Sequence, residues 1–184
     1  MCEVKRSVCR SFHIDTNLIN SRSKLLSMNQ LEQWHENGVI LIIESEVVQK
    51  EAMVGNNPLR VGKALGYVYT YTLAGSEEQK QLFEIASIIF PKGIINSNQI
   101  NDVEIVFNAL KYIAILLTND GASKSQPGGI LGHRAELKKK FGITIMTDKE
   151  AVEYVRSLIN KRDQRARNMC KQTGEPLPEW VGKD

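Results

Sequence analysis

The sequence lacks a long apolar segment. No run approaches the ~18 consecutive apolar residues that a membrane-spanning helix requires. The charged start, Met1–Arg6, is not followed by the apolar stretch of a secretory signal. These absences argue against a membrane or secreted protein, so we expect a cytoplasmic one. Its 184 residues, 42% hydrophobic and 24% charged, suit a soluble domain with a sizeable core.

Cysteine is also scarce, at three residues: Cys2, Cys9 and Cys170. The number is odd and no C-x-x-C pair occurs, so neither a disulfide framework nor a familiar zinc motif is indicated. A cluster of Cys2 and Cys9 with His13 is conceivable, but its spacing matches no common zinc pattern. We expect all three cysteines to be reduced thiols.

Motifs for covalent or nucleotide-driven chemistry are missing too. The histidines have no catalytic-triad context, and no serine stands in a nucleophile-elbow pattern. The glycine-containing stretch 55–64 ends in Gly62-Lys63, but the glycine spacing is too wide for a phosphate-binding loop, and Ala64 replaces the required Ser or Thr. These absences exclude a serine hydrolase and a P-loop nucleotidase.

Strand-like and helix-like segments alternate along the chain. Apolar, β-branched runs predict strands at 8–14, 39–43, 112–117 and 143–146. Helices are predicted at 28–37, 45–52, 59–71, 76–89, 102–111, 135–141 and 148–167, a flexible loop at 121–132 and a tail from 173. Strands separated by helices indicate an α/β fold with three α/β/α layers around a central, mostly parallel sheet.

Four carboxylates stand where a predicted strand ends or a helix begins: Asp15, Glu51, Asp102 and Asp120. Ligands of open α/β sheets bind at the carboxyl ends of the strands, so acids delivered there converge. Converging carboxylates repel one another unless they hold a divalent cation. Taken singly, Asp15 and Asp102 are also explained as helix caps, Glu51 as a solvated helix residue and Asp120 as part of a turn.

Other acids compete for the same roles. Glu44 and Glu46 flank the end of the second predicted strand, but Glu51 shares a helix face with Val47 and Val48 and so turns with the apolar side. Asp148, which follows the last predicted strand, is a candidate fifth acid.

These pieces resemble the PIN-domain nucleases, a family that includes the toxin ribonucleases of bacterial toxin–antitoxin pairs. The matching motifs, in family order, are I-D-T-N at Ile14–Asn17, S-x-V-x-x-x-E at Ser45–Glu51, D-x-x-I-x-x-x-A at Asp102–Ala109 and L-L-T-N-D at Leu116–Asp120. The resemblance spans roughly residues 11 to 160 and departs from the family in an insert at 121–142 and a C-terminal tail. We divide the chain accordingly into a PIN-like domain, 1–162, and an extension, 163–184.

The resemblance implies a metal-dependent endoribonuclease. Asp15, Glu51, Asp102 and Asp120 would hold Mg²⁺ or Mn²⁺, supported by Asn17, Thr118 and Asn119. RNA would be the substrate, and an antitoxin-like inhibitor protein and a homodimer are the partners that the family suggests. Two alternatives stay open: a non-catalytic PIN-like module that binds nucleic acid or protein, and a nuclease specific for DNA structures. The insert is either a substrate-gating loop or a surface excursion, and we favour the second.

Positive charge is concentrated late in the chain. The net charge is only +3, but between Arg134 and Lys171 eleven Lys or Arg stand against five Asp or Glu. This distribution suits either a solvated helix face or a phosphate-binding stripe. The residues that we predict to bind nucleic acid are Arg134, Lys138, Lys139 and Lys140.

Overall fold

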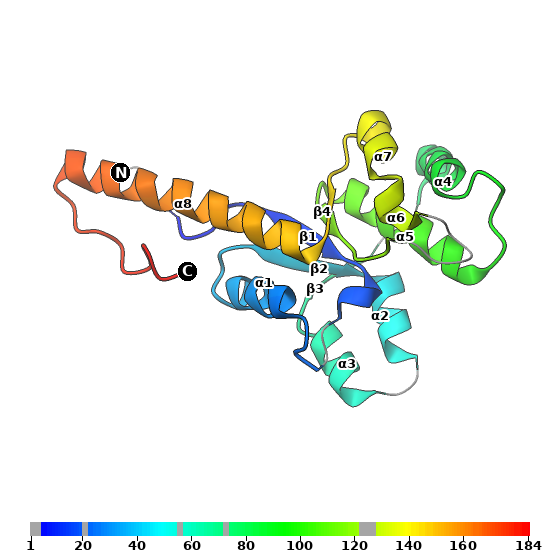
Figure 1. The fold of residues 1–184 in the computed structure, drawn as a ribbon, viewed down its shortest axis with the longest axis horizontal. Coiled ribbons are helices and arrows are strands. Elements are labelled where there is room, and N and C mark those ends of the chain that lie inside the picture. The colour runs from blue at the N-terminus through cyan, green and yellow to red at the C-terminus, as the bar shows by residue number, and fades with distance from the viewer. Residues whose placement is uncertain (1–4, 20–21, 55–56, 72–73, 122–127) are drawn as a thin grey trace.

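The computed structural model describes residues 5–19, 22–54, 57–71, 74–121 and 128–184. Strands and helices alternate along the chain (Figure 1). In chain order they are β1 (Ser11–Ile14), η1 (Thr16–Leu18), α1 (Leu26–Glu36), β2 (Leu41–Ser45), α2 (Glu46–Met53), α3 (Pro58–Ala64), β3 (Val68–Thr70), α4 (Ser76–Ile89), α5 (Ser97–Lys111), β4 (Ile115–Leu117), α6 (Gly129–Gly132), α7 (Arg134–Phe141), β5 (Ile145–Met146) and α8 (Asp148–Thr173).

The sheet reverses its strand order between β1 and β4. The order across the sheet is β3-β2-β1-β4-β5, and every neighbouring pair is parallel. Phe12 of β1 pairs with Ile42 of β2 on one side and with Ile115 of β4 on the other. The chain therefore leaves β1 toward one edge of the sheet and leaves β4 toward the other. Such a switch point opens a crevice at the carboxyl ends of the two strands.

Helices cover both faces of the sheet. On one face α1 packs against α8 and β2, and α8 packs against β5. On the other, α5 packs against β1 and β4, while α2 packs against β2 and α5. Phe12, Ile14, Leu116 and Leu117 in the two central strands are fully buried between these layers, each contributing about 1.5–3 kcal/mol by leaving water. The predicted three-layer α/β/α fold is confirmed, and its central sheet is wholly parallel.

One predicted helix is wrong over half of its length. Residues 59–71 were expected to be helical throughout, but α3 ends at Ala64 and Val68–Thr70 forms β3. Gly66 interrupts the helical pattern, and the β-branched and aromatic residues after it pair with β2 at the edge of the sheet. A strand of three residues is stable only because it pairs with β2. Local propensity does not predict such a pairing.

The start of α5 is also earlier than predicted. We expected Asp102 to begin the helix, but Ser97 does so, and the side chain of Asn96 caps it by accepting from the N–H of Gln99 at 3.1 Å. Asp102 therefore lies inside the helix. Its interpretation as a helix cap is excluded.

The insert is part of the core rather than a surface excursion. Ile130 of α6 and Leu137 of α7 are fully buried in the same hydrophobic core as the sheet. Residues 122–127 of the predicted flexible loop lie outside the described residues.

The last helix is longer than predicted. Helix α8 continues through residue 163 without a break and ends at Thr173, and Gly174 follows in the left-handed conformation typical of a helix end. Within the described ranges, no helix combines the length and apolarity needed to cross a membrane. Cys9 and Cys170 are free thiols, and Cys2 lies outside the described residues.

Candidate active site

Thr118 joins the ends of the two central strands. Thr118 directly follows β4, and Asp15 directly follows β1. The hydroxyl of Thr118 donates to Oδ2 of Asp15 at 2.6 Å. Oγ1 of Thr118 in turn accepts the backbone N–H of Asp120 at 2.9 Å. Asp15 and Asp120 are thereby mounted side by side at the carboxyl ends of β1 and β4, where the strand order reverses.

The two predicted supporting asparagines complete this network. Asn17 donates from its side chain to Oδ2 of Asp15 at 2.7 Å and to Oγ1 of Thr118 at 3.2 Å. Its side-chain oxygen accepts the backbone N–H of Asn119 at 3.2 Å. Asp15 is buried, so it is not a surface group, and its Oδ2 accepts from the side chains of Thr118 and Asn17.

Glu51 reaches the same region from α2. The hydroxyl of Thr16 donates to its Oε2, and the side-chain amide of Asn101 donates to its Oε1 at 2.6 Å. Glu51 and Asn101 also line a shallow pocket of about 270 Å³ with Lys50 and Glu104. Sequence reasoning missed Thr16 and Asn101, although each is adjacent to a predicted acid, because the contacts bridge segments far apart in the chain.

Asp120 is held by the insert. Its Oδ2 accepts the backbone N–H of Ile130 at 2.8 Å, and its carbonyl accepts that of Leu131 at 3.0 Å. Gly129 makes this approach possible: a Cβ there would lie 2.6 Å from both the carbonyl and the carboxylate oxygen of Asp120, and its φ of +53° also favours glycine. The paired glycines at 128–129 were the available signal, and we had assigned them to a loop.

The carboxylates repel one another. Burial, followed by the charges of Asp15, Asp120 and Glu51, raises the pKa of Asp102 to about 7. Burial also raises the pKa of Asp15 to about 6, with smaller increases from Asp120 and Glu51, although hydrogen bonds from Thr118 and Asn17 oppose the shift. No described Lys or Arg offsets either shift. The charges of Asp120 and Glu51 thus act on both Asp15 and Asp102.

This group suits a hard divalent cation. Its ligand atoms are carboxylate oxygens, the class that Mg²⁺ and Mn²⁺ prefer. In the described part of the chain, no group of three or more Asp, Glu, His or Cys side chains is placed so that it could hold a metal ion. A metal at this site would instead be held as Mg²⁺ usually is, by one or two carboxylates, several waters and a substrate phosphate. No described residue donates a hydrogen bond to Asp102, so both of its carboxylate oxygens are available for a ligand.

The competing acids lie in other surroundings. Asp148 is buried at the first position of α8, where its Oδ1 accepts from the side chain of Asn119 at 3.2 Å, so it adjoins the site without acting on Asp15 or Asp102. Glu44 is fully buried and accepts from Gln49 at 3.1 Å, and burial raises its pKa to about 7. Of the acids on and beside α2, only Glu51 contributes to the shifts of the site.

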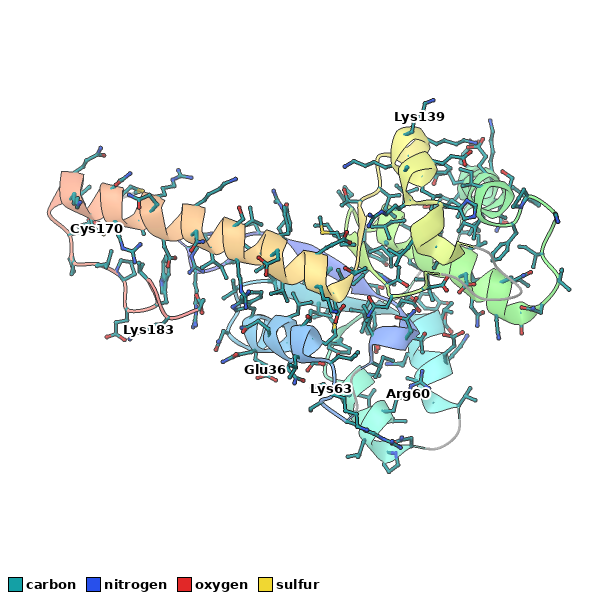
Figure 2. The ribbon with its side chains drawn as sticks, in the orientation of Figure 1. Glu36, Arg60, Lys63, Lys139, Cys170 and Lys183 are labelled. Atoms are coloured by element: carbon teal, nitrogen blue, oxygen red, sulfur yellow. The ribbon has the colours of Figure 1, made fainter. Side chains whose placement is uncertain are left out.

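Two of the four predicted nucleic-acid-binding residues are engaged in ion pairs. Arg134 pairs with Glu150 at 3.0 Å, and Lys140 pairs with Glu84 at 3.3 Å and lies over the ring of Phe141. Lys138 and Lys139 are exposed and make no ion pair with any described residue, and Figure 2 shows Lys139 pointing away from the tip of α7. The cluster therefore offers less free charge than its sequence suggests.

Comparisons with known proteins give limited information. No protein-family model matches the chain, and no curated protein matches it. Among the solved structures that match is a chain from the crystal structure of VapBC2 from Rickettsia felis bound to a DNA fragment from its promoter. That match has 18% sequence identity and a TM-score of 0.46, and it covers 74% of this chain and 98% of the other.

Replacing Gly129 with alanine should displace Asp120. The new Cβ would meet backbone and carboxylate oxygens at 2.6 Å in a positive-φ conformation, so we expect a loss of at least about 1–2 kcal/mol in unfolding free energy. Gly132→Ala is the matched control, because nothing lies within 4 Å of its Cβ position. Thermal unfolding of both variants checks this, and equal melting temperatures would contradict the close approach.

The two raised carboxyl pKa values should make the metal-free protein less stable as the pH rises from about 4 to about 7. Folding raises the pKa of Asp102 to about 7 and that of Asp15 to about 6, so in this window the folded chain binds more protons than the unfolded chain, and rising pH favours unfolding. Asp102→Asn should reduce this loss by about 1–3 kcal/mol after solvent screening. Urea unfolding in EDTA across the pH range measures it, with the exposed Glu36→Gln as control. An unchanged pH dependence in Asp102→Asn would refute the assignment.

Proposed function

We propose that this chain is a metal-dependent endoribonuclease that hydrolyses RNA phosphodiester bonds. The observation that supports this most strongly is the group of carboxylates beside the switch point between β1 and β4, in which the charges of Asp120 and Glu51 help to raise the pKa of Asp15 and Asp102 and no described cation offsets these shifts. A purely structural cluster gains nothing from such repulsion. A divalent cation bound at the site would remove it.

Asp15, Asp102, Asp120 and Glu51 are the residues that would hold the metal. When Mg²⁺ or Mn²⁺ is bound at such a site, it supplies activation of water and neutralisation of charge on the scissile phosphate. The chain's own contribution is orientation. Thr118 fixes Asp15, and the backbone N–H of Ile130 fixes Asp120.

Glu51 and Asp102 have different surroundings and hence different proposed roles. Both oxygens of Glu51 already accept hydrogen bonds, from Thr16 and Asn101, so it is suited to orient a ligand or its water. Asp102 accepts none from the described residues, and its pKa of about 7 lies near neutral pH. It is suited to bind the cation directly, and an arriving cation would lower its pKa again.

Partners other than RNA rest on the sequence resemblance. We include an antitoxin-like inhibitor protein and a second copy of the chain in the proposal. A light-scattering mass of the purified protein tests the homodimer.

The proposal is tested by Asp120→Asn. The amide keeps an acceptor for the N–H of Ile130 but removes one charge, so Mn²⁺-dependent RNA cleavage should fall about 10–100-fold or more. Melting in EDTA should be unchanged or slightly higher, because one source of repulsion is gone. Glu36→Gln, an acid-to-amide change at an exposed position of α1, should keep full activity.

The outcomes separate the alternatives. Full activity with a lowered melting temperature in Asp120→Asn would show that the residue is structural. RNA binding without cleavage at millimolar Mn²⁺ would favour the non-catalytic module. Cleavage of structured DNA but not RNA would favour the DNA nuclease.

A further inference from the structure

Helix α8 starts at the candidate site and extends well beyond the sheet. Its first residue, Asp148, accepts a hydrogen bond from the side chain of Asn119, which precedes Asp120. Its 26 residues correspond to a length of about 39 Å at 1.5 Å per residue. Figure 1 shows its C-terminal half running past the sheet, and in Figure 2 Cys170 marks the end farthest from the site. The question is what this projecting half contacts.

On one side of the projecting half, Arg162 and Asp163 contact Arg6 and the segment 180–184. We call this set of contacts the brace. Arg162 donates to Asp163 at 2.6 Å and to Asp184 at 3.0 Å, and the ring of Trp180 lies 4.4 Å from its guanidinium carbon. Arg6 pairs with Asp184, and the N–H of Gly182 donates to Asp163 at 2.7 Å. The side chains of Arg6 and Arg162 pair with those of Asp163 and Asp184. These four side chains hold the helix and together carry no net charge.

The other side of this half carries only cations and neutral polar groups. Between residues 154 and 173 the only acid is Asp163, which is buried in the brace. Lys161, Arg165 and Lys171 are exposed, and none of them makes an ion pair with a described residue. At about 100° per residue they fall within about 120° of the helix circumference. We call these three residues the α8 cation face.

The side chains around this face restrict the type of partner. Gln164 and Asn168 lie between the cations, and the side-chain amide of Gln164 donates a hydrogen bond to Oδ1 of Asn168 at 3.0 Å. A membrane-binding helix needs a wide apolar face, and a protein interface needs buried apolar anchors. This face has neither. The exposed acids Glu175 and Glu179 belong to the segment that folds back on the braced side. Cations with amide side chains and no acid suit a phosphate backbone.

We propose that the α8 cation face binds the backbone of a helical RNA segment that flanks the cleavage site. The proposal rests on the proposed function. Lys161 and Lys171 lie about 20 Å and 35 Å along the helix from Asp148. At about 3 Å per nucleotide of a helical RNA strand, somewhat less than the ~3.4 Å of duplex DNA, the face reaches RNA about 7–12 nucleotides from the site. The preferred substrate is therefore a folded RNA with a helical stem, and a short linear fragment cannot reach both places.

The test measures binding without catalysis. Wild type and Lys161→Gln/Arg165→Gln/Lys171→Gln are titrated in EDTA with a hairpin RNA whose stem has about 20 base pairs and with a linear RNA of about five nucleotides. For the hairpin, the variant should bind on the order of tenfold more weakly or worse, and the slope of log K against log salt should flatten by up to about 2.7. Binding of the short RNA should not change.

A matched control removes the same charge elsewhere. Lys24→Gln/Lys80→Gln/Lys92→Gln replaces three exposed lysines that make no ion pair with any described residue, and it should bind the hairpin like wild type. Unchanged hairpin affinity and salt slope in the α8 variant would overturn the proposal. Equal loss in the control would also overturn it, because the effect would then be net charge alone. Equally tight, equally variant-sensitive binding of duplex DNA would overturn the assignment to RNA.

Failure of the catalytic proposal has a different signature. In Mn²⁺, a chain with no nuclease activity cleaves neither RNA, whatever its binding in EDTA. If both proposals hold, the α8 variant cleaves the short RNA at the wild-type rate and shows a raised KM, with kcat preserved, for the hairpin alone.

Discussion

The site depends on the repulsion among carboxylates at the divergence of β1 and β4. The hydrogen bonds that side chains and backbone of the described residues donate to the carboxylates of these acids come from neutral groups: hydroxyls of Thr16 and Thr118, amides of Asn17 and Asn101, and the backbone N–H of Ile130. A lysine or arginine would stabilise a buried carboxylate more strongly than any of these. Neutral donors orient an acid without cancelling its charge, and this combination leaves the group able to attract a cation.

The sequence indicates where the candidate acids lie, but it does not indicate all of the contacts that support them. Asp15 and Asp120 follow apolar strands, and parallel strands bring such ends together, so their proximity was predictable. Glu51 was chosen over Glu44 by helical spacing, and its charge does act on Asp15 and Asp102. Asn101 and Gly129 make their contacts across distant segments or by close backbone approach. Two further features were not predicted. The helical pattern over residues 59–71 hid the pairing of β3 with β2, and the cap at Asn96 starts α5 earlier than the position of Asp102 indicated.

Helix α8 is likewise arranged so that opposite charges stay apart. Its first turn is bonded to the acidic end of the sheet through Asn119 and closed by a capping box between Thr147 and Glu150. Its other end places Arg162 in a neutral brace and leaves Lys161, Arg165 and Lys171 in solvent. A rigid helix thus keeps the negative group and the positive face apart instead of letting them pair.

The distance between the two has an electrostatic consequence. Lys161, the nearest member of the cation face, lies about 20 Å along the helix from Asp148, whereas charges in physiological salt are screened over about 8 Å. The face therefore cannot relieve the repulsion at Asp15 and Asp102, and the acids cannot weaken the face. RNA phosphates, which the acids repel, can be held at a distance by the face. At the acids themselves, a divalent cation would offset the repulsion between a phosphate and the carboxylates. In the proposed function each charged surface therefore binds its own ligand: the acids a metal ion, and α8 the backbone that presents the scissile bond.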